Sequence, residues 1–246
     1  MATPYATVEV DEVTSTQDEA RRWFDEAPSD RPLLLIAARQ VRGRGRSGRE
    51  WWPAPRALAS SLAMLEPSGG TRLGLLPMML GLAVRDAVAE CHGVALGLKW
   101  PNDLMLGDAK VGGILVEHSS PVVVAGVGVN LWWPDAPAGA AGIERSDPGA
   151  AAASRLAHAW VGRFLTNLES GVWDRDAYVA ASVTLGRDVS WEPAGSGTVV
   201  GIDDDGGLVV HTVSGRVTLR AGEIHHLRSG TSLAPGPPAT QESHPE

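Results

Sequence analysis

Arginine and glycine alternate through one short segment that lies between two apolar runs of this 246-residue chain. Residues 42–49 read Arg-Gly-Arg-Gly-Arg-Ser-Gly-Arg and hold four arginines and three glycines. Glycine lets a backbone approach a ligand closely, and the planar guanidinium fork matches a carboxylate or a phosphate. We therefore predict that residues 39–51, called the flap below, form a mobile cationic segment that closes over an anionic ligand.

Arginine–glycine runs also occur in segments that bind nucleic acid through its phosphates. Two features of the whole chain argue against that interpretation. The formal charge is −8 and the isoelectric point is near 5.4, the wrong sign for a general polyanion binder. Lysine occurs only at Lys99 and Lys110. A nucleic-acid-binding module therefore stays as the non-enzymatic alternative, which would predict a salt-dependent mobility shift on DNA or RNA.

The composition is that of an ordinary globular protein, with 43% apolar and 20% charged residues. A single cysteine, Cys91, excludes an internal disulfide and a thiolate zinc cage. The N-terminus lacks the basic and apolar pattern of a signal peptide, and no apolar run reaches the ~20 residues that span a bilayer. We expect a cytoplasmic protein with no membrane partner.

Hydroxyl and amide side chains begin the first predicted helix, at Ser15-Thr16-Gln17. That helix is expected to run to about Asp25, and Thr16 with Glu19 fits a capping box. The hydroxyls then either cap the helix alone or, together with free backbone N–H groups, face a small polar ligand.

Lys99 lies near the end of another predicted strand, Val94–Trp100. The sequence continues as Pro101-Asn102-Asp103, which predicts a rigid turn beside Lys99. This places the ammonium group of Lys99 at the rim of a site. Asn102 and Asp103 either contribute to that site or only form the turn.

Four glycines interrupt a predicted hairpin of two central strands, Lys110–Glu117 and Val122–Asn130. Glycine weakens a strand and often marks the close approach of a ligand or of another backbone. The hairpin is therefore either a flat floor under a planar ligand or a surface for tight helix packing. The four are Gly112, Gly113, Gly126 and Gly128.

The remaining pattern predicts the elements that position these residues. Further strands are expected at 7–13, 33–38 and 57–65, and further helices at 73–91, 150–170 and 175–182. Pro77 predicts a kink or a late start near Leu75 in the second helix. From Gly186 on, short strands with Asp-Gly and Ser-Gly turns predict a small β-barrel of SH3-like size. Asp203–Asp205 is expected to be a hairpin turn rather than a calcium loop.

In their order and spacing, these motifs resemble those of biotin protein ligases, from about Val8 to Arg228. The resemblance implies an α+β fold: a mixed central β-sheet with flanking helices, like the catalytic domain of class II aminoacyl-tRNA synthetases and biotin ligases, plus a small C-terminal SH3-like β-barrel. We expect a catalytic domain over residues 1–182, the barrel over 183–229 and a disordered tail over 230–246.

The resemblance also implies a two-step reaction. Biotin attacks the α-phosphate of ATP, which gives biotinyl-5′-AMP and pyrophosphate. A lysine of a carboxylase carrier domain then attacks this mixed anhydride and releases AMP. ATP and biotin are the expected substrates and Mg²⁺ the expected ATP counter-ion, and no metal site of the protein itself is predicted.

By the same resemblance, Lys99 and Arg44 are the expected catalytic residues. Lys99 would lie between the biotin carboxylate and the α-phosphate, and Trp51 would pack on the adenine. The residues expected to bind biotin are Ser15, Thr16, Gln17, Gln40, Gly43, Arg44, Gly45, Arg46, Lys99, Gly112, Gly113 and Gly126. Those expected to bind ATP and the adenylate are Arg44, Arg46, Arg49, Trp51, Lys99, Asn102 and Asn130.

Two departures from the family pattern bear on function. Gln17 stands where the family commonly has asparagine, which leaves its individual role open. The first ligand motif begins at Ser15, which leaves no room before it for a DNA-binding helix-turn-helix, so we expect an enzyme without a repressor function. A lipoate protein ligase is the enzymatic alternative, although its Arg-Arg-x-Ser-Gly-Gly-Gly signature is absent from the chain.

Overall fold

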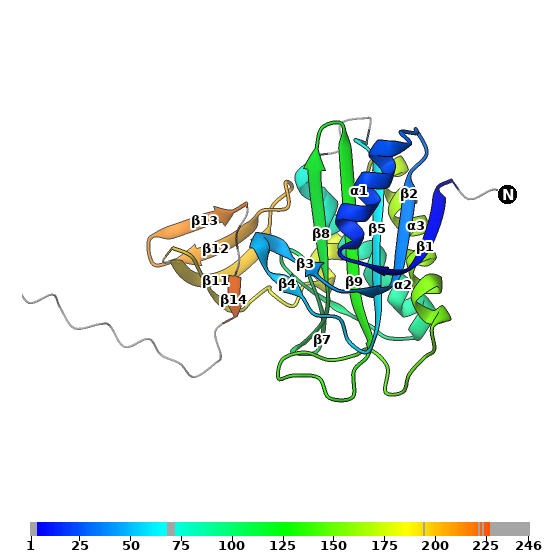
Figure 1. The fold of residues 1–246 in the computed structure, drawn as a ribbon. Helices are drawn as coiled ribbons and strands as arrows, with labels where there is room; N and C mark the ends of the chain where they lie inside the picture. The colour runs from blue at the N-terminus through cyan, green and yellow to red at the C-terminus, as the bar shows by residue number, and fades with distance from the viewer. Residues whose placement is uncertain (1–3, 68–71, 194, 221, 223, 227–246) are drawn as a thin grey trace, which may run out of the picture.

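The fold was analysed in a computed structural model, which describes residues 4–67, 72–193, 195–220, 222 and 224–226. A seven-stranded mixed sheet forms its centre, in the order β1-β2-β5-β9-β8-β7-β6 (Figure 1). Strands β1 and β2 pair in parallel, and every other neighbouring pair in this sheet is antiparallel. The strands are β1 (Ala6–Val13), β2 (Leu33–Gln40), β5 (Arg56–Leu65), β6 (Gly97–Lys99), β7 (Asp103–Leu106), β8 (Ala109–Ser119) and β9 (Val122–Trp132).

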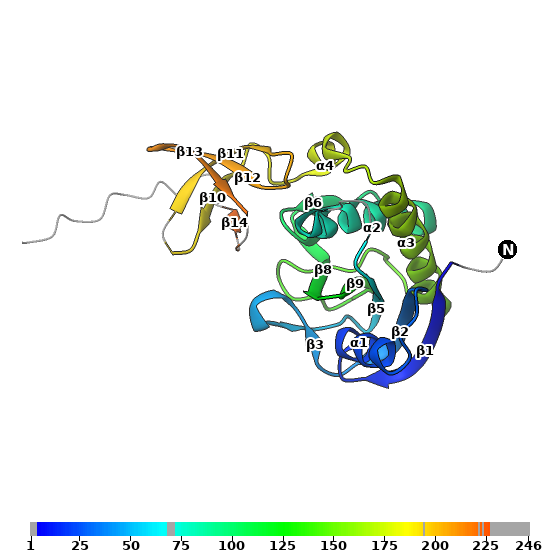
Figure 2. The ribbon, with the colours of Figure 1, turned by 90° about the horizontal axis from the view of Figure 1, so that it is seen from above.

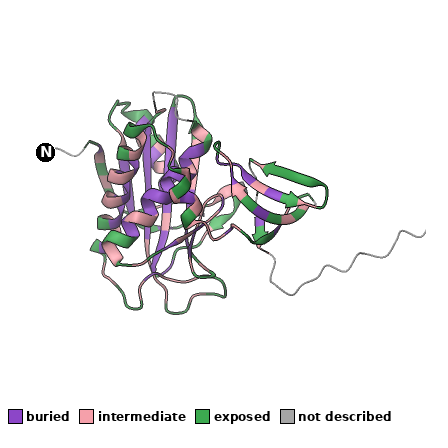
Figure 3. Cartoon of the chain, turned by 180° about the vertical axis from the view of Figure 1, so that it is seen from behind, coloured by how far each residue is buried: buried purple, intermediate pink, exposed green. Residues whose placement is uncertain are grey.

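Helices cover both faces of this sheet (Figure 2). Helix α1 (Thr16–Glu26) lies on one face and packs Ala20 and Phe24 against the sheet, while its outer side is charged. Helices α2 (Leu76–His92) and α3 (Ala151–Ser170) cover the other face. Helix α3 packs on β5 and β2, and α2 packs beside it on β6, β7 and β8. Because α2 contacts both the sheet and α3, it is apolar around most of its circumference, and the main core forms there (Figure 3).

The start of α2 confirms the prediction made from Pro77. A 3₁₀ turn over Leu73–Leu75 precedes the helix, and Pro77 lies in the first helical turn. Proline is tolerated there because the backbone N–H groups of the first turn have no helical partner to lose.

A second sheet follows the short helix α4 (Arg175–Ala181). It is antiparallel, in the order β13-β12-β11-β10-β14, and confirms the small C-terminal β-domain. Its strands are β10 (Asp188–Trp191), β11 (Gly195–Ile202), β12 (Leu208–Thr212), β13 (Gly215–Leu219) and β14 (Ile224–His226). The Asp203 carboxylate accepts the N–H groups of Asp205 and Gly207, which confirms the predicted turn. The tail predicted over 230–246 lies outside the described residues.

The flap forms two short strands, β3 (Gly43–Arg44) and β4 (Glu50–Trp51), around a 3₁₀ turn. Two local predictions need correction. The strand before Lys99 begins at Gly97, three residues later than expected. Thr16 is not the helix cap: Ser15 holds that position, and neither forms a side-chain cap, because the Thr16 hydroxyl lies beside Ser61 instead.

None of the helices in the described part of the chain combines the length and the apolar character needed to cross a bilayer.

Candidate active site

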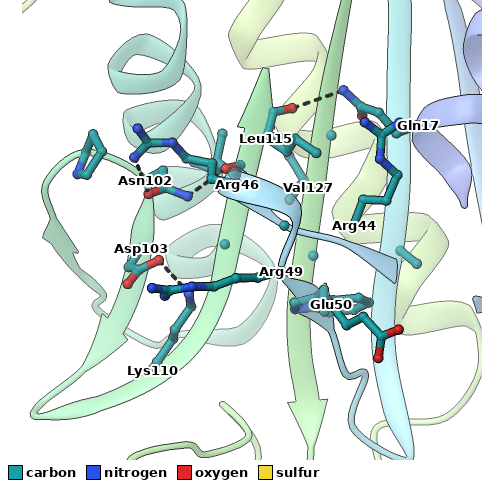
Figure 4. Close-up of a pocket in the computed structure, with 18 of the residues that line it drawn as sticks. Gln17, Arg44, Arg46, Arg49, Glu50, Asn102, Asp103, Lys110, Leu115 and Val127 are labelled. Atoms are coloured by element: carbon teal, nitrogen blue, oxygen red, sulfur yellow. Dashed lines mark hydrogen bonds and ion pairs between the residues drawn. The ribbon is translucent and has the colours of Figure 1, made fainter. Parts of the chain in front are cut away.

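A cavity of about 150 Å³ lies where the flap meets the start of α1 and the β8–β9 hairpin (Figure 4). It brings together most of the residues that the sequence motifs singled out. The predicted residues that line it are Ser15, Thr16, Gln17, Gln40, Arg44, Gly45, Arg46, Arg49, Trp51, Lys99, Asn102, Gly113 and Gly126. Gly43, Gly112 and Asn130 lie outside its lining.

The inner end of the cavity is neutral, polar and buried. The Gln40 side-chain oxygen accepts the Thr16 backbone N–H at 2.7 Å. Ser61 Oγ lies 2.9 Å from Thr16 Oγ1 and 3.1 Å from Gln17 Oε1. The Gln17 amide donates to the Val124 carbonyl on β9 at 2.9 Å. Glutamine is one methylene longer than asparagine, and this extra length lets the amide reach β9.

One hydroxyl in this end has no partner. Ser15 is 2% exposed, and its Oγ makes no hydrogen bond with any described residue. A buried polar atom without a partner is unfavourable, so such atoms mark places where a ligand or a water supplies the missing bond. Since Ser15 lines the cavity, its Oγ is available to a polar ligand.

The hairpin glycines serve different purposes. A Cβ added at Gly126 would lie 2.4 Å from Gln17 Oε1, and one at Gly128 would lie 2.7 Å from the Trp51 indole. At Gly113 a Cβ would meet only ordinary contacts, the nearest at 3.7 Å on Lys110. These three glycines form the cavity floor. At Gly112 the obstacle is a backbone oxygen of the neighbouring strand at 2.4 Å, so that glycine serves sheet packing.

The outer end of the cavity is cationic (Figure 4). Arg46 donates to the Asn102 side-chain oxygen at 3.2 Å, and the Asn102 amide donates in turn to the Ile114 carbonyl at 2.9 Å. The Lys110 ammonium lies 2.5 Å from Asp103 Oδ1. Asn102 therefore anchors Arg46 as well as shaping the turn.

Lys110, Asp103 and Ser61 line the cavity but were missing from the predicted site. The signal for Lys110 was present, because the chain has only two lysines and both reach this cavity. Ser61 gave a weaker signal as a polar residue inside an apolar strand.

Arg44 lines the cavity, but its guanidinium is turned toward α1 and the end of β8. One nitrogen contacts the Asp18 carboxylate, and another lies 2.5 Å from Glu117 Oε1. The flap side chain that contacts Asn102 at the cationic end is Arg46.

The C-terminal domain also reaches the cavity, through Gly222 and Ile224. The neighbouring His226 has a pKa lowered to about 4 by its burial and by the positive charge of Lys99. Its ring is therefore neutral at neutral pH and adds no charge to the cationic end. Trp100 ties the two domains together, because its indole N–H donates to the Gly206 carbonyl at 2.9 Å.

The two other predicted residues outside the lining have structural partners. A Cβ at Gly43 would lie 2.5 Å from the Trp51 carbonyl oxygen, so glycine permits the close β3–β4 pairing. Asn130 is buried, and its backbone carbonyl accepts the Ile143 N–H at 3.0 Å.

This arrangement suits an elongated ligand with a neutral polar head and an anionic end. The head meets buried hydroxyl and amide groups, the middle lies on glycine backbone, and the anionic end meets arginine and lysine. Among the described residues, no three histidine, cysteine, aspartate or glutamate side chains gather as a metal site.

Comparisons with known proteins agree with the geometry. The model of the biotin/lipoate A/B protein ligase family matches residues 8–131, and that of the biotin protein ligase C-terminal domain matches residues 186–227. The biotin–[acetyl-CoA-carboxylase] ligase of Mycobacterium tuberculosis is 36% identical over 80% of this chain and 79% of its own length. The Paracoccus denitrificans enzyme of the same name is 30% identical over 77% and 88%.

Among solved structures, the biotin protein ligase of Aquifex aeolicus, in complex with biotin and ATP, superposes with a TM-score of 0.75. It is 27% identical and covers 91% of this chain and 99% of its own. Both domains are matched, in sequence and in fold. The chain therefore belongs to the biotin/lipoate A/B protein ligase family.

Proposed function

We propose that the protein is a biotin–[acetyl-CoA-carboxylase] ligase, which activates biotin with ATP to biotinyl-5′-AMP and transfers the biotin to a lysine of a carboxylase carrier domain. The observation that carries this proposal is the two-ended cavity. Its inner end offers Ser15, Gln17 and other buried polar groups to a ureido ring. Its outer end offers cations to a carboxylate and to phosphates, whose mutual repulsion must be offset before they react.

The experiment that tests this function is ATP–pyrophosphate exchange in the presence of biotin, of lipoate or of no acid. Exchange that requires biotin is expected, because it reports the first half-reaction directly. Exchange with lipoate in place of biotin would contradict the pocket assignment while leaving adenylation intact. A folded sample with magnesium that exchanges with neither acid would contradict the enzyme assignment.

Magnesium enters this proposal as the counter-ion of ATP. Its chemistry would be to neutralise phosphate charge. Two carboxylates line the cavity: Asp103 pairs with Lys110, and Glu50 lies on the flap strand β4. The single cysteine fits a cytoplasmic protein.

Removal of the unpartnered hydroxyl gives a prediction for biotin binding. Ser15→Ala is expected to raise the KM for biotin about tenfold, the effect of losing one hydrogen bond to a ligand. The melting temperature should not fall, because the Ser15 hydroxyl has no partner among the described residues. Ser61→Ala is the contrasting variant: it removes contacts with Thr16 and Gln17, so it should lower both biotin affinity and stability. An unchanged KM in Ser15→Ala would contradict the role of Ser15.

An exposed tryptophan beside the cavity gives a prediction for carrier docking. Trp52 is 73% exposed and follows Trp51, which lines the cavity. Exposed aromatic side chains often dominate the energy of a protein interface. Trp52→Ala is expected to raise the KM for the carrier about tenfold and to leave biotin-dependent exchange unchanged. Val213→Ala, at an exposed turn of the C-terminal sheet, serves as the control. Equal carrier KM values in the two variants would place docking elsewhere.

A further inference from the structure

The flap is attached to the rest of the protein in two different ways. At its base, backbone hydrogen bonds join Val41 and Arg42 to Val13 and Thr14 at 3.0 and 2.9 Å. Beyond the base, glycine-rich backbone has little intrinsic order, so side-chain contacts must determine where the flap lies. These contacts include Trp51 over Gly128, Arg46 on Asn102, and Arg44 between two carboxylates.

The Arg44 contact joins the flap to both walls of the cavity. Asp18 follows Gln17 on α1, and Glu117 lies two residues after Leu115 on β8. Gln17 and Leu115 both line the cavity, and the Gln17 amide lies 3.4 Å from the Leu115 carbonyl oxygen. A guanidinium has donors on both of its terminal nitrogens and can therefore bridge two carboxylates at once.

We propose that Asp18 and Glu117 form a carboxylate clamp: they are positioning residues that hold the flap over the cavity through Arg44 and so set how long the biotinyl-adenylate is retained. This inference rests on the proposed function. The clamp does not touch the reacting atoms in this arrangement. It acts by keeping the flap, with Arg46 and Trp51, in place over the ligand.

The exposure of the clamp makes it reversible. The side chains of Arg44, Asp18 and Glu117 are 43%, 56% and 39% exposed. The same three residues also line a second cleft, together with Arg21 and Asp25. Ion pairs in such a setting are weak and are screened by salt. The flap can therefore open to admit substrates, and high salt should favour its opening.

The test compares Asp18→Asn, Glu117→Gln and the double variant with Asp25→Asn. Asp25 is the matched control, because it lies on the same helix and forms its ion pair with Arg21 instead of with the flap. The first readout needs no ligand: the rate of tryptic cleavage within residues 44–49, followed by mass spectrometry. We expect the double variant to be cleaved about fivefold to tenfold faster than the wild type, and Asp25→Asn to match the wild type.

The second readout is escape of the adenylate, measured as biotin attached to serum albumin in the absence of a carrier domain. The enzyme itself offers only two lysines, so albumin captures most of the escaping adenylate. Labelling per adenylate formed should rise about fivefold or more in the double variant. In an Arg44→Met background, the two carboxylate substitutions should cause no further increase in labelling, because their effect depends on Arg44.

Two results would overturn the clamp: cleavage and labelling equal to those of Asp25→Asn, or full effects that persist in the Arg44→Met background. A failure of the proposed function is distinguishable from both. It would appear as absent biotin-dependent exchange in the wild type, whereas flap cleavage is measured without substrates.

Raising the salt concentration to 1 M should speed flap cleavage in the wild type and leave the double variant unchanged, when both are normalised to a cleavage site outside the flap.

Discussion

Biotin-dependent pyrophosphate exchange is expected to fall by at least two orders of magnitude when Lys99 is replaced with methionine. The reacting carboxylate and the α-phosphate are both anions, and the charge between them grows in the transition state. A fixed ammonium group offsets that charge, and loss of one such preorganised group typically lowers kcat by about 10²–10³. Lys99 lines the cavity, and its positive charge lowers the pKa of His226 across the domain boundary.

The parallel variant Lys110→Met decides which of the two lysines contributes more to stabilising the transition state. Lys110 lies in the same cavity but forms an ion pair with Asp103, so part of its charge is already neutralised by the protein. If only Lys110→Met loses exchange, the catalytic role moves to Lys110. Unchanged exchange in both variants would contradict the mechanism altogether.

The control for these lysines is Arg187→Met. Arg187 is a cation near the same domain boundary, where it also lowers the pKa of His226, but it lies outside the cavity lining. Its ion pair with Asp108 is 3.7 Å long. Its removal should leave exchange within about twofold of the wild type. Melting temperatures of all three variants should stay close to that of the wild type, because partly exposed ion pairs contribute only about 0–1 kcal/mol.

The sequence predicted the parts of this site that depend on local patterns. Glycine spacing, the Pro-Asn-Asp turn and strand alternation are encoded within a few residues, and they located the cavity floor, the Asn102 corner and the flap. The late start of α2 is one of the two outcomes predicted from Pro77, because proline restricts its own backbone and that of its neighbour.

Contacts between distant segments could not be predicted in this way. Ser60 and Ser61 are adjacent polar residues in one apolar strand, and alternation sends them to opposite faces. Ser61 meets Gln17 in the cavity, whereas Ser60 accepts the indole N–H of Trp160 in the core at 3.2 Å. Which serine faces the ligand depends on how the sheet packs. The partners of Arg44 likewise lie 26 and 73 residues away.

A single methyl group at Gly128 tests whether the floor and the flap work as one unit. In Gly128→Ala the new Cβ would lie 2.7 Å from two atoms of the Trp51 indole, closer than real contacts allow. The indole must move, and Trp51 pairs with Gly43 in the flap strands, so the flap must move with it. We expect adenylate formation to fall about tenfold or more, with a raised KM for ATP and increased labelling of albumin.

The fold of Gly128→Ala should survive, because the obstacle is a side chain on the flap rather than the sheet itself. Gly112→Ala provides the contrast: its Cβ would lie 2.4 Å from the Gly128 carbonyl oxygen, so it should lower the melting temperature strongly. Gly162→Ala in α3 meets nothing within 4 Å and should be neutral or stabilising by about 1 kcal/mol.

The origin of the Gly128→Ala defect can be isolated by repeating the substitution in a Trp51→Ala background. If the methyl group acts by displacing the indole, it has nothing to displace there, and the two substitutions together should be no worse than Trp51→Ala alone. A further tenfold loss in the double variant would instead mean that the methyl group obstructs the ligand directly. Either result measures how much of adenylate formation depends on a flap that rests on glycine backbone.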